Sequence, residues 1–489
     1  MCYICVENYT HMINRLINLE VQQFRAIQNA NIDLNGITVV AGENGCGKST
    51  LSKLLYNTIK ISHNYDAIIK QRLNQELKDI INALYSTLRD VSLDNYHIET
   101  AEDKSENKID NRWVNRTSRR ALIIKSDEDI FDYRDRIFTY IEQVENYLQI
   151  RLNQYYHNRQ INIHTSLFDE NDLSRYNKYP SRMDRILKLL YNTVYNNDDE
   201  ISSNSNVDTL FSSLRSKIDE AVQKANNRLD YRPISCFLDE LSSAFSQNID
   251  NIRFNLYELD SPIIDWTHEM LNPTNLVQDC VYIDTPMAIG HQYSSDLYWD
   301  DLSDTLRQSK PIFNNNIISE INSTIADSNI ISGQVFYDDN MINNGFAYKR
   351  NDGHIFDLEE CATGIKSFGI LQMLLQNGIL SKNTLLIIDE PEAHLHPQWI
   401  VEYARIIVLL NKKLGVKFFI TSHNPDMVSA IRYIAEKENI LTNINFYLAE
   451  KDTTNQYTYN YKALGIEIDA IFESFNIALE RINLYGVSE

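Results

Sequence analysis

The stretch ITVVAGENGCGKST, residues 37–50, decides the fold of this 489-residue chain. It opens with a short β-branched run that is typical of a buried strand. The text from Gly42 to Ser49 then matches the pattern G-x-x-x-x-G-K-[ST] without a mismatch, and leucines at helical spacing follow it. A strand, a glycine-rich loop and a helix in this order predict a phosphate-binding loop.

The residue types of this loop suit a nucleoside triphosphate. Glycines let backbone N–H groups close around phosphates, and the helix N-terminus adds partial positive charge. Lys48 is expected to reach the β- and γ-phosphates, and the Ser49 hydroxyl to ligate Mg²⁺. We therefore expect ATP and Mg²⁺ as cofactors. The expected contacts of the loop are Gly42, Asn44, Gly45, Cys46, Gly47, Lys48, Ser49 and Thr50.

A second signal is LLIIDE, residues 385–390. Four apolar residues before two carboxylates describe a buried strand whose carboxyl end reaches a site. Asp389 would hold the Mg²⁺ hydration shell opposite Ser49, and Glu390 would polarise the attacking water. The alternative is that both acids only cap the next turn. The phosphate loop favours the functional reading.

A third signal is VKFFITSH, residues 416–423, which reads as another strand beside the acidic one. His423 at its end is expected to contact the γ-phosphate and to respond to hydrolysis. Asn424 and Pro425 have a simpler explanation, because they form a good helix start.

A fourth signal is ATGIKS, residues 362–367, which opens a helix shortly before the acidic strand. Small residues at a helix N-terminus supply a second cluster of backbone amides for a phosphate. In hexameric-ring AAA+ proteins the acidic strand follows the phosphate loop much sooner and no such element precedes it.

The two ends of the chain have α/β patterning, whereas the middle looks helical. Apolar stripes at helical spacing run from Leu73 to Leu88 and from Ile137 to Leu148. We therefore predict an α/β head built discontinuously from residues 1–57 and 278–489. Residues 58–277 would be a mostly helical insertion that serves as an arm or lid, or contacts a partner or nucleic acid.

The composition narrows the function classes. A formal net charge of −21 argues against a general DNA-coating protein. The insertion has one basic cluster, formed by Arg112, Arg116, Arg119 and Arg120, which is either a local nucleic-acid contact or a solvated loop. The low cysteine count and the lack of a long apolar run lead us to expect a cytoplasmic protein without membrane contact.

The order of these parts resembles the ABC-type ATPase heads of the SMC, RecF and OLD superfamily. The resemblance covers about half of the chain, its two ends. In that family, residues 42–49 correspond to Walker A, 362–367 to the ABC signature, and 389–390 to Walker B with the catalytic glutamate, while His423 is the switch histidine. The fold that this implies is a RecF-like P-loop head.

The resemblance carries further expectations for single residues. Arg25, in a Phe-Arg element of the first hairpin, would approach the nucleotide phosphates. Thr363, Gly364 and Lys366 would complete the ATP site of a second copy, so that ATP bridges two heads in a homodimer or higher oligomer. Ala362 stands at the usual signature serine, which implies slow hydrolysis. Gln292 is the candidate for the Q-loop.

The wording ATGIKSFGIL, DEPEAHLHP and TSHNPD is most similar to stand-alone ATPases of bacterial anti-phage systems of the Septu type, the PtuA family, including retron-associated forms. This implies a regulatory ATPase that controls a separate effector nuclease of HNH type, with a reverse transcriptase and its msDNA as further partners in a retron. The alternative is a DNA repair or processing ATPase of RecF or OLD type that acts directly on DNA. The text after His423 is too short for the TOPRIM domain of OLD enzymes, which favours the first reading.

Overall fold

The computed structural model describes residues 16–99, 119–159, 182–194, 207–247, 249, 253–286, 297–311, 315–327, 330–338, 345–393 and 395–473. The chain divides into two compact units. The sheet unit comprises Met1–His63 and Pro233–Glu489, and the helical unit comprises Asn64–Arg232. The two ends of the sequence thus form one body, and the segment between them forms another.

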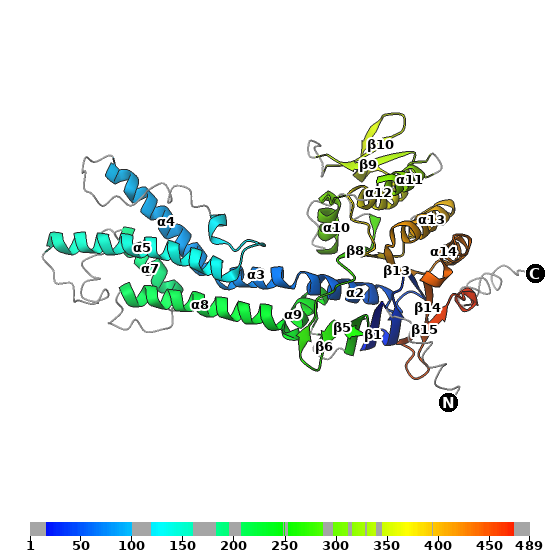
Figure 1. Ribbon diagram of the computed structural model, residues 1–489, viewed down its shortest axis with the longest axis horizontal. Coiled ribbons are helices and arrows are strands. Elements are labelled where there is room, and N and C mark those ends of the chain that lie inside the picture. Colours follow the sequence, from blue (N-terminus) through cyan, green and yellow to red (C-terminus); the bar gives the residue numbers. More distant parts are fainter. Residues whose placement is uncertain are drawn as a thin grey trace, which may run out of the picture. The chain divides into compact units, whose positions relative to one another are not determined.

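The sheet unit is organised around ten strands in the order β5-β4-β1-β2-β15-β14-β3-β13-β12-β8. Several of these strands are labelled in Figure 1. In chain order they are β1 (Ile17–Phe24), β2 (Ile27–Asp33), β3 (Ile37–Ala41), β4 (Arg253–Glu258), β5 (Ser261–Pro262), β8 (Asp279–Ile283), β12 (Thr384–Asp389), β13 (Lys417–Ser422), β14 (Ile444–Lys451) and β15 (Tyr459–Gly465). The hairpin predicted within residues 16–34 is confirmed, because β1 and β2 pair antiparallel.

Five neighbouring strands, β14, β3, β13, β12 and β8, run parallel. In their register Ala41 of β3 lies opposite Ser422 of β13, and Thr421 of β13 lies opposite Asp389 of β12. The carboxyl ends of the three strands that carry the sequence signals therefore meet at one edge of the sheet. Crevices at this edge of parallel sheets are where ligands bind in α/β folds.

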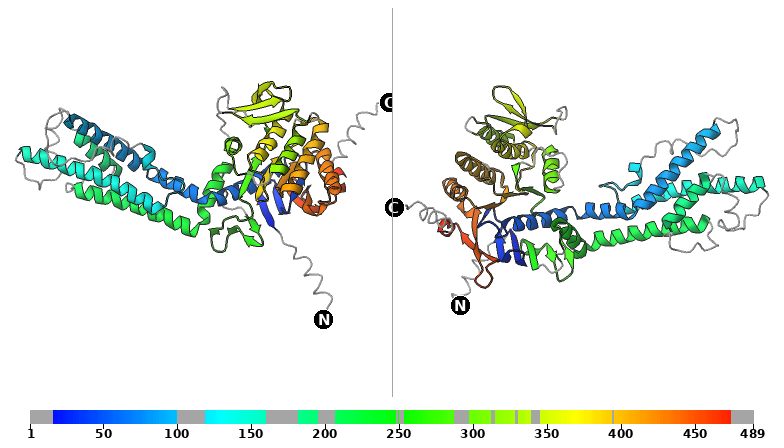
Figure 2. Two further views of the ribbon diagram at one scale, coloured as in Figure 1. Left: turned by 45° about the horizontal axis from the view of Figure 1, so that its top comes forward. Right: turned by 180° about the vertical axis from the view of Figure 1, so that it is seen from behind.

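Helices cover both faces of these parallel strands. On one face Val39, Ile388 and Ile420 join a core with apolar residues of several helices, of which α12, α13 and α14 lie side by side (Figure 2). The helices of the sheet unit are α2 (Lys48–His63), α9 (Ile234–Phe245), α10 (Leu297–Arg307), α11 (Asn315–Ile325), α12 (Thr363–Gln376), α13 (Pro397–Leu414) and α14 (Pro425–Lys437).

Helix α2 packs on the other face, against β8, β12 and β13. Side chains alternate along a strand, so Asp389 and Thr421 point to the same face as the buried residues Ile387 and Phe419. Asp389 therefore lies under α2, the helix that begins at the phosphate loop.

Smaller elements complete the sheet unit. A three-stranded sheet contains β9 (Gly333–Tyr337), β10 (Phe346–Arg350) and β11 (Ile355–Asp357), and a two-stranded one contains β6 (Ile264–Asp265) and β7 (Met270–Leu271). Short 3₁₀ helices are η4 (Leu358–Glu360) and η5 (Leu441–Asn443).

The structure moves the predicted domain boundaries from 57/58 and 277/278 to 63/64 and 232/233. The second change is large because β4 pairs with β1 and extends the main sheet, so residues 253–258 belong to the sheet unit. The strands from β4 to β7 have two to six residues each and follow a long helical stretch, so the sequence pattern did not predict them.

The helical unit contains α3 (Tyr65–Glu76), α4 (Lys78–Glu99), η2 (Arg119–Leu122), α5 (Ile130–Arg159), α7 (Arg182–Val194) and α8 (Val207–Tyr231). The helical character predicted for this segment is confirmed for its described part. Both predicted apolar stripes are buried: Leu73, Leu77, Ile80, Leu84, Leu88, Ile137, Ile141, Val144 and Leu148. Helix α8 packs on α3, α5 and α7, so the stripes form the core of this unit.

No described helix is both long enough and apolar enough to cross a membrane.

Candidate functional site

The phosphate loop has a backbone path that glycine makes possible. Gly45 and Gly47 have φ of +82° and +99°, a region that side chains disfavour. A Cβ atom on Gly42 would lie 2.8 Å from Ala449 Cβ and 2.9 Å from Cys46 Sγ. The loop therefore lies directly against β14 and its own turn, and its shape depends on these glycines.

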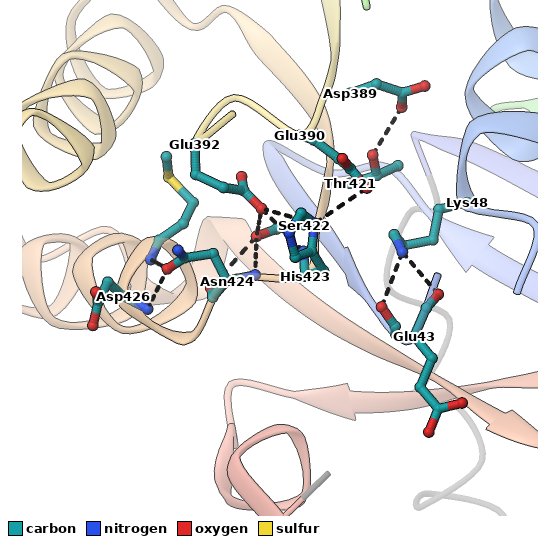
Figure 3. Close-up of polar contacts among 12 residues, drawn as sticks. Glu43, Lys48, Asp389, Glu390, Glu392, Thr421, Ser422, His423, Asn424 and Asp426 are labelled. Atoms are coloured by element: carbon teal, nitrogen blue, oxygen red, sulfur yellow. Dashed lines mark hydrogen bonds and ion pairs between the residues drawn. The ribbon is translucent and has the colours of Figure 1, made fainter. Parts of the chain in front are cut away.

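Lys48 is buried, and its ammonium group is held inside the loop. Its Nζ donates to the backbone oxygens of Gly42 at 2.9 Å and Glu43 at 3.0 Å (Figure 3). Asn44, Gly45 and Ser49 are exposed, whereas Thr50 is half-buried. The loop thus presents an exposed rim around a cation fixed by the loop's own carbonyls.

Cys46 lies on the inner side of the loop. Its side chain is fully buried, and burial raises the pKa of its thiol while the neighbouring Lys48 charge opposes the shift. Its backbone oxygen accepts a hydrogen bond of 2.8 Å from the Tyr461 hydroxyl. Cys46 therefore anchors the loop to β15 through its backbone oxygen, while its buried side chain does not face the exposed rim of the loop.

Asp389 is held by three hydroxyl groups from three different elements. Its Oδ1 accepts from Thr421 Oγ1 of β13 at 2.8 Å and from Ser52 Oγ of α2. Its Oδ2 accepts from the Tyr282 hydroxyl of β8 at 2.8 Å. Hydroxyl donors on both oxygens fix the carboxylate and leave lone pairs free, since a carboxylate offers about four acceptor positions.

Sequence reasoning expected Asp389 opposite Ser49. The α2 hydroxyl that contacts it is that of Ser52, one helical turn later. Ser52 and Tyr282 were missed, although the i, i+3 spacing of Ser49 and Ser52 places both hydroxyls on one side of the helix. Tyr282 gave no comparable signal, because its role depends on β8 lying beside β12.

Glu390 and His423 face each other at the end of the acidic strand (Figure 3). Glu390 Oε1 lies 3.2 Å from His423 Nδ1, and both side chains are partly exposed. Glu390 has a left-handed backbone with φ of +47°, and its amide donates to the Thr421 carbonyl at 2.9 Å. Such a conformation costs about 1–3 kcal/mol outside glycine and clusters at functional sites. The strained turn aims Glu390 at the histidine.

The turn of the fourth signal begins α12, and its side chains point into their own unit. Lys366 is buried and its Nζ donates to the Glu359 carbonyl at 2.8 Å. Ser367 Oγ donates to the Thr363 carbonyl at 3.0 Å. Gly364 packs on the Trp399 ring of α13, where an added Cβ would lie 2.1 Å from Cζ3.

Gly364→Ala is expected to destabilise the chain by about 1–3 kcal/mol, because the new methyl group overlaps the Trp399 ring. Urea unfolding measures this change. In a Trp399→Ala background the same alanine should cost much less, because the ring is gone. An equal cost in both backgrounds would show that the destabilisation does not come from overlap with the Trp399 ring.

Arg25 lies in the turn between β1 and β2 and points to α9. Its guanidinium carbon lies 5.5 Å from the Phe24 ring centroid and 4.9 Å from that of Phe245. One nitrogen donates to the Phe245 carbonyl at 3.3 Å and to Gln247 Oε1 at 3.2 Å. The structure thus places this arginine at the C-terminal end of α9, where the helix dipole favours a cation.

Some sequence expectations fall outside the described residues. These are the Q-loop candidate Gln292 and, in the basic cluster, Arg112 and Arg116. Of Arg119 and Arg120, only the backbone is described, in η2.

The residues present fit ATP with Mg²⁺. The glycine cradle, which Cβ atoms would fill, and the fixed Lys48 ammonium suit a triphosphate. The described residues contain no group of three or more His, Cys, Asp or Glu side chains that could hold a metal. Mg²⁺ keeps several waters and takes few protein ligands besides phosphate oxygens, so the Ser49 hydroxyl and the Asp389 carboxylate are ligand types that suit it.

Similar solved structures include a Smc head domain with an extended coiled coil from Pyrococcus furiosus, bound to the C-terminal domain of ScpA, with 12% identity over 95% of this chain and 98% of that chain and a TM-score of 0.29. Another is the SMC head domain from Thermotoga maritima, with 9% identity over 92% of this chain and 99% of that chain and a TM-score of 0.31.

No curated protein sequence matches the chain. The sequence model of the AAA ATPase domain family matches residues 15–428, which include the phosphate loop, the acidic strand and His423. The fold is an α/β P-loop ATPase head with a large helical insertion, and the chain belongs to the AAA ATPase domain family.

Proposed function

We propose that the chain is a slow, Mg²⁺-dependent ATPase whose nucleotide state regulates a separate effector in bacterial anti-phage defence. The observation that carries the ATPase assignment is the meeting of three features at one sheet edge. These are the phosphate loop with Lys48, the hydroxyl-held Asp389, and the Glu390–His423 pair.

In this proposal each side chain has its own task. Lys48 and the loop amides bind the triphosphate. Ser49 and Asp389 would hold Mg²⁺, which when bound would neutralise the charge of the phosphates. Glu390 orients and polarises the attacking water. His423, whose Nδ1 lies 3.2 Å from Glu390 Oε1, would contact the γ-phosphate.

The second half of the site would come from another copy. Thr363 begins a helix whose N-terminal amides can stabilise a phosphate, and we propose that this turn completes the ATP site of a neighbouring head. Ala362 lacks the hydroxyl usual at this position, so we expect ATP to act mainly as a clamp between two copies. The Lys366 ammonium contributes to the shape of the turn through the Glu359 carbonyl.

The regulatory role is supported by the similarity of three motif sequences, at residues 362–371, 389–397 and 421–426, to those of Septu-type ATPases, including retron-associated forms. It implies an HNH nuclease as the controlled effector, with a reverse transcriptase and msDNA where the gene lies in a retron. The neighbouring open reading frames test this directly. An adjacent HNH gene is the expected result, and an adjacent TOPRIM-nuclease gene would contradict it.

Phosphate release from ATP tests the enzymatic proposal. We expect Mg²⁺-dependent turnover below about 1 s⁻¹, at the low end of the usual range for enzymes. Turnover that persists with EDTA in place of Mg²⁺ would contradict the assignment of Ser49 and Asp389.

A plasmid-nicking assay separates this proposal from direct DNA processing. The purified chain with ATP and either Mg²⁺ or Mn²⁺ should leave supercoiled plasmid intact. Robust cleavage by the purified chain, whether or not it requires Lys48, would overturn the regulatory reading.

A further inference from the structure

Glu392 is a buried acid two residues after Glu390 that none of the assigned roles uses. Its side chain is only 3% exposed, and it lies in the tight turn that follows β12. Its Oε1 accepts from Ser422 Oγ at 2.8 Å and from the His423 backbone amide at 3.0 Å (Figure 3). One carboxyl oxygen thus holds two consecutive residues at the end of β13.

The same oxygen lies close to the imidazole. His423 Nδ1 is 3.6 Å from Glu392 Oε1 and 3.2 Å from Glu390 Oε1. Nδ1 therefore lies near two carboxyl groups, one buried and one partly exposed. Because the backbone of His423 is fixed by Glu392, the position of the ring relative to Glu390 depends on that bond.

The contacts of Glu392 extend to the helix after the histidine. Ser422 Oγ, which donates to Glu392, also accepts from the Asn424 amide at 3.0 Å. Asn424 Oδ1 in turn caps α14 by accepting from the Asp426 amide at 2.7 Å. The corner between β13 and α14 is therefore connected to the acidic turn through one buried side chain.

We propose that Glu392 is a positioning residue that holds His423 against Glu390, because its oxygen accepts hydrogen bonds from the Ser422 hydroxyl and the His423 backbone amide. This inference deepens the proposed ATPase function and rests on it. Glu392 acts through His423 and contacts no phosphate. Its contribution therefore belongs to the hydrolysis step, and ATP binding should be independent of it.

The surroundings of the carboxyl group indicate that Glu392 acts through the position of its accepting oxygen and not through its negative charge. The Glu392 Oε2 atom is buried and accepts no hydrogen bond from the described residues. Burial also raises the pKa of Glu392. Folding therefore disfavours its ionised form, and this cost grows as pH rises above the unfolded pKa. An amide of the same length keeps the accepting oxygen without that cost.

Two conservative variants separate reach from charge. Glu392→Gln keeps the length and the accepting oxygen, whereas Glu392→Asp keeps the charge but withdraws the oxygen by one methylene. We expect the Gln variant to retain at least half of the wild-type kcat and the Asp variant to lose about tenfold or more. The KM for ATP should stay within about twofold in both, because Lys48 and the loop are untouched.

The melting temperatures of both variants and of the wild type are measured alongside the kinetics. The Gln variant should melt close to the wild type at pH 7, because the lost cost of ionisation and the buried NH₂ group at the Oε2 position act in opposite directions. An Asp variant as active as the Gln variant, or more active, would overturn the inference, as would equal losses in both. If the wild type hydrolyses ATP but this order fails, only the role of Glu392 is wrong. Absence of hydrolysis in the wild type would instead reject the proposed function.

Discussion

Lys48→Ala is expected to lower the affinity for ATP about 100-fold or more. The ammonium group is the only charged donor that the loop holds in a fixed place, through the carbonyls of Gly42 and Glu43. Hydrogen bonds to charged groups contribute about 1.5–3 kcal/mol each, and 1.4 kcal/mol is tenfold in affinity. Isothermal titration of ATP with Mg²⁺ measures the change.

Lys53→Ala is the matched control for this prediction. It removes the same charge from the same helix, but the Lys53 ammonium lies over the Tyr298 ring at 4.9 Å from its centroid. ATP affinity in this control should stay within about threefold of the wild type. Unchanged affinity in the Lys48 variant would contradict the assignment of the loop, provided that the variant melts as a folded protein.

Glu390→Gln is expected to lower kcat about 10²–10⁴-fold while ATP remains bound. A positioned general base contributes a factor of this size, and the amide cannot take up a proton. The amide can still occupy the strained turn, since only the terminal group changes. Single-turnover hydrolysis measures the rate, and filter binding of labelled ATP measures retention.

The control for this variant is Glu438→Gln, which neutralises a partly exposed surface carboxylate paired with Lys412 at 2.7 Å. Surface ion pairs of this kind contribute about 0–1 kcal/mol. Its turnover should equal that of the wild type. A Glu390→Gln chain that hydrolyses ATP at the wild-type rate would place the base elsewhere.

Local signals were enough to predict the strands and the motifs at their ends. The β3 strand and the glycine loop follow from neighbouring residues, and so does the acid-bearing end of β12. That their ends meet follows from the rule that parallel strands share a carboxyl edge. The register of Ala41, Ser422 and Asp389 confirms this expectation.

The contacts around these residues could not be predicted, because they join distant parts of the chain. Ser52 reaches Asp389 across 337 positions in the sequence, and Tyr282 reaches it across 107. Arg25 packs on Phe245 because β4 and α9 belong to the sheet unit. The long helical stretch before them gave no sign in the sequence that they do. Glu392 follows Walker B without a pattern that predicts a contact, and only the structure shows what its carboxyl oxygen holds.

The central claim is that two copies enclose a shared triphosphate, and a cryo-EM structure of the Glu390→Gln chain with ATP and Mg²⁺ tests it most directly. We expect at least two copies, in which the Thr363 turn of one head contacts the phosphates held by Lys48 of the other. A map in which ATP occupies the loop while that turn lies far from every neighbouring nucleotide would contradict the account.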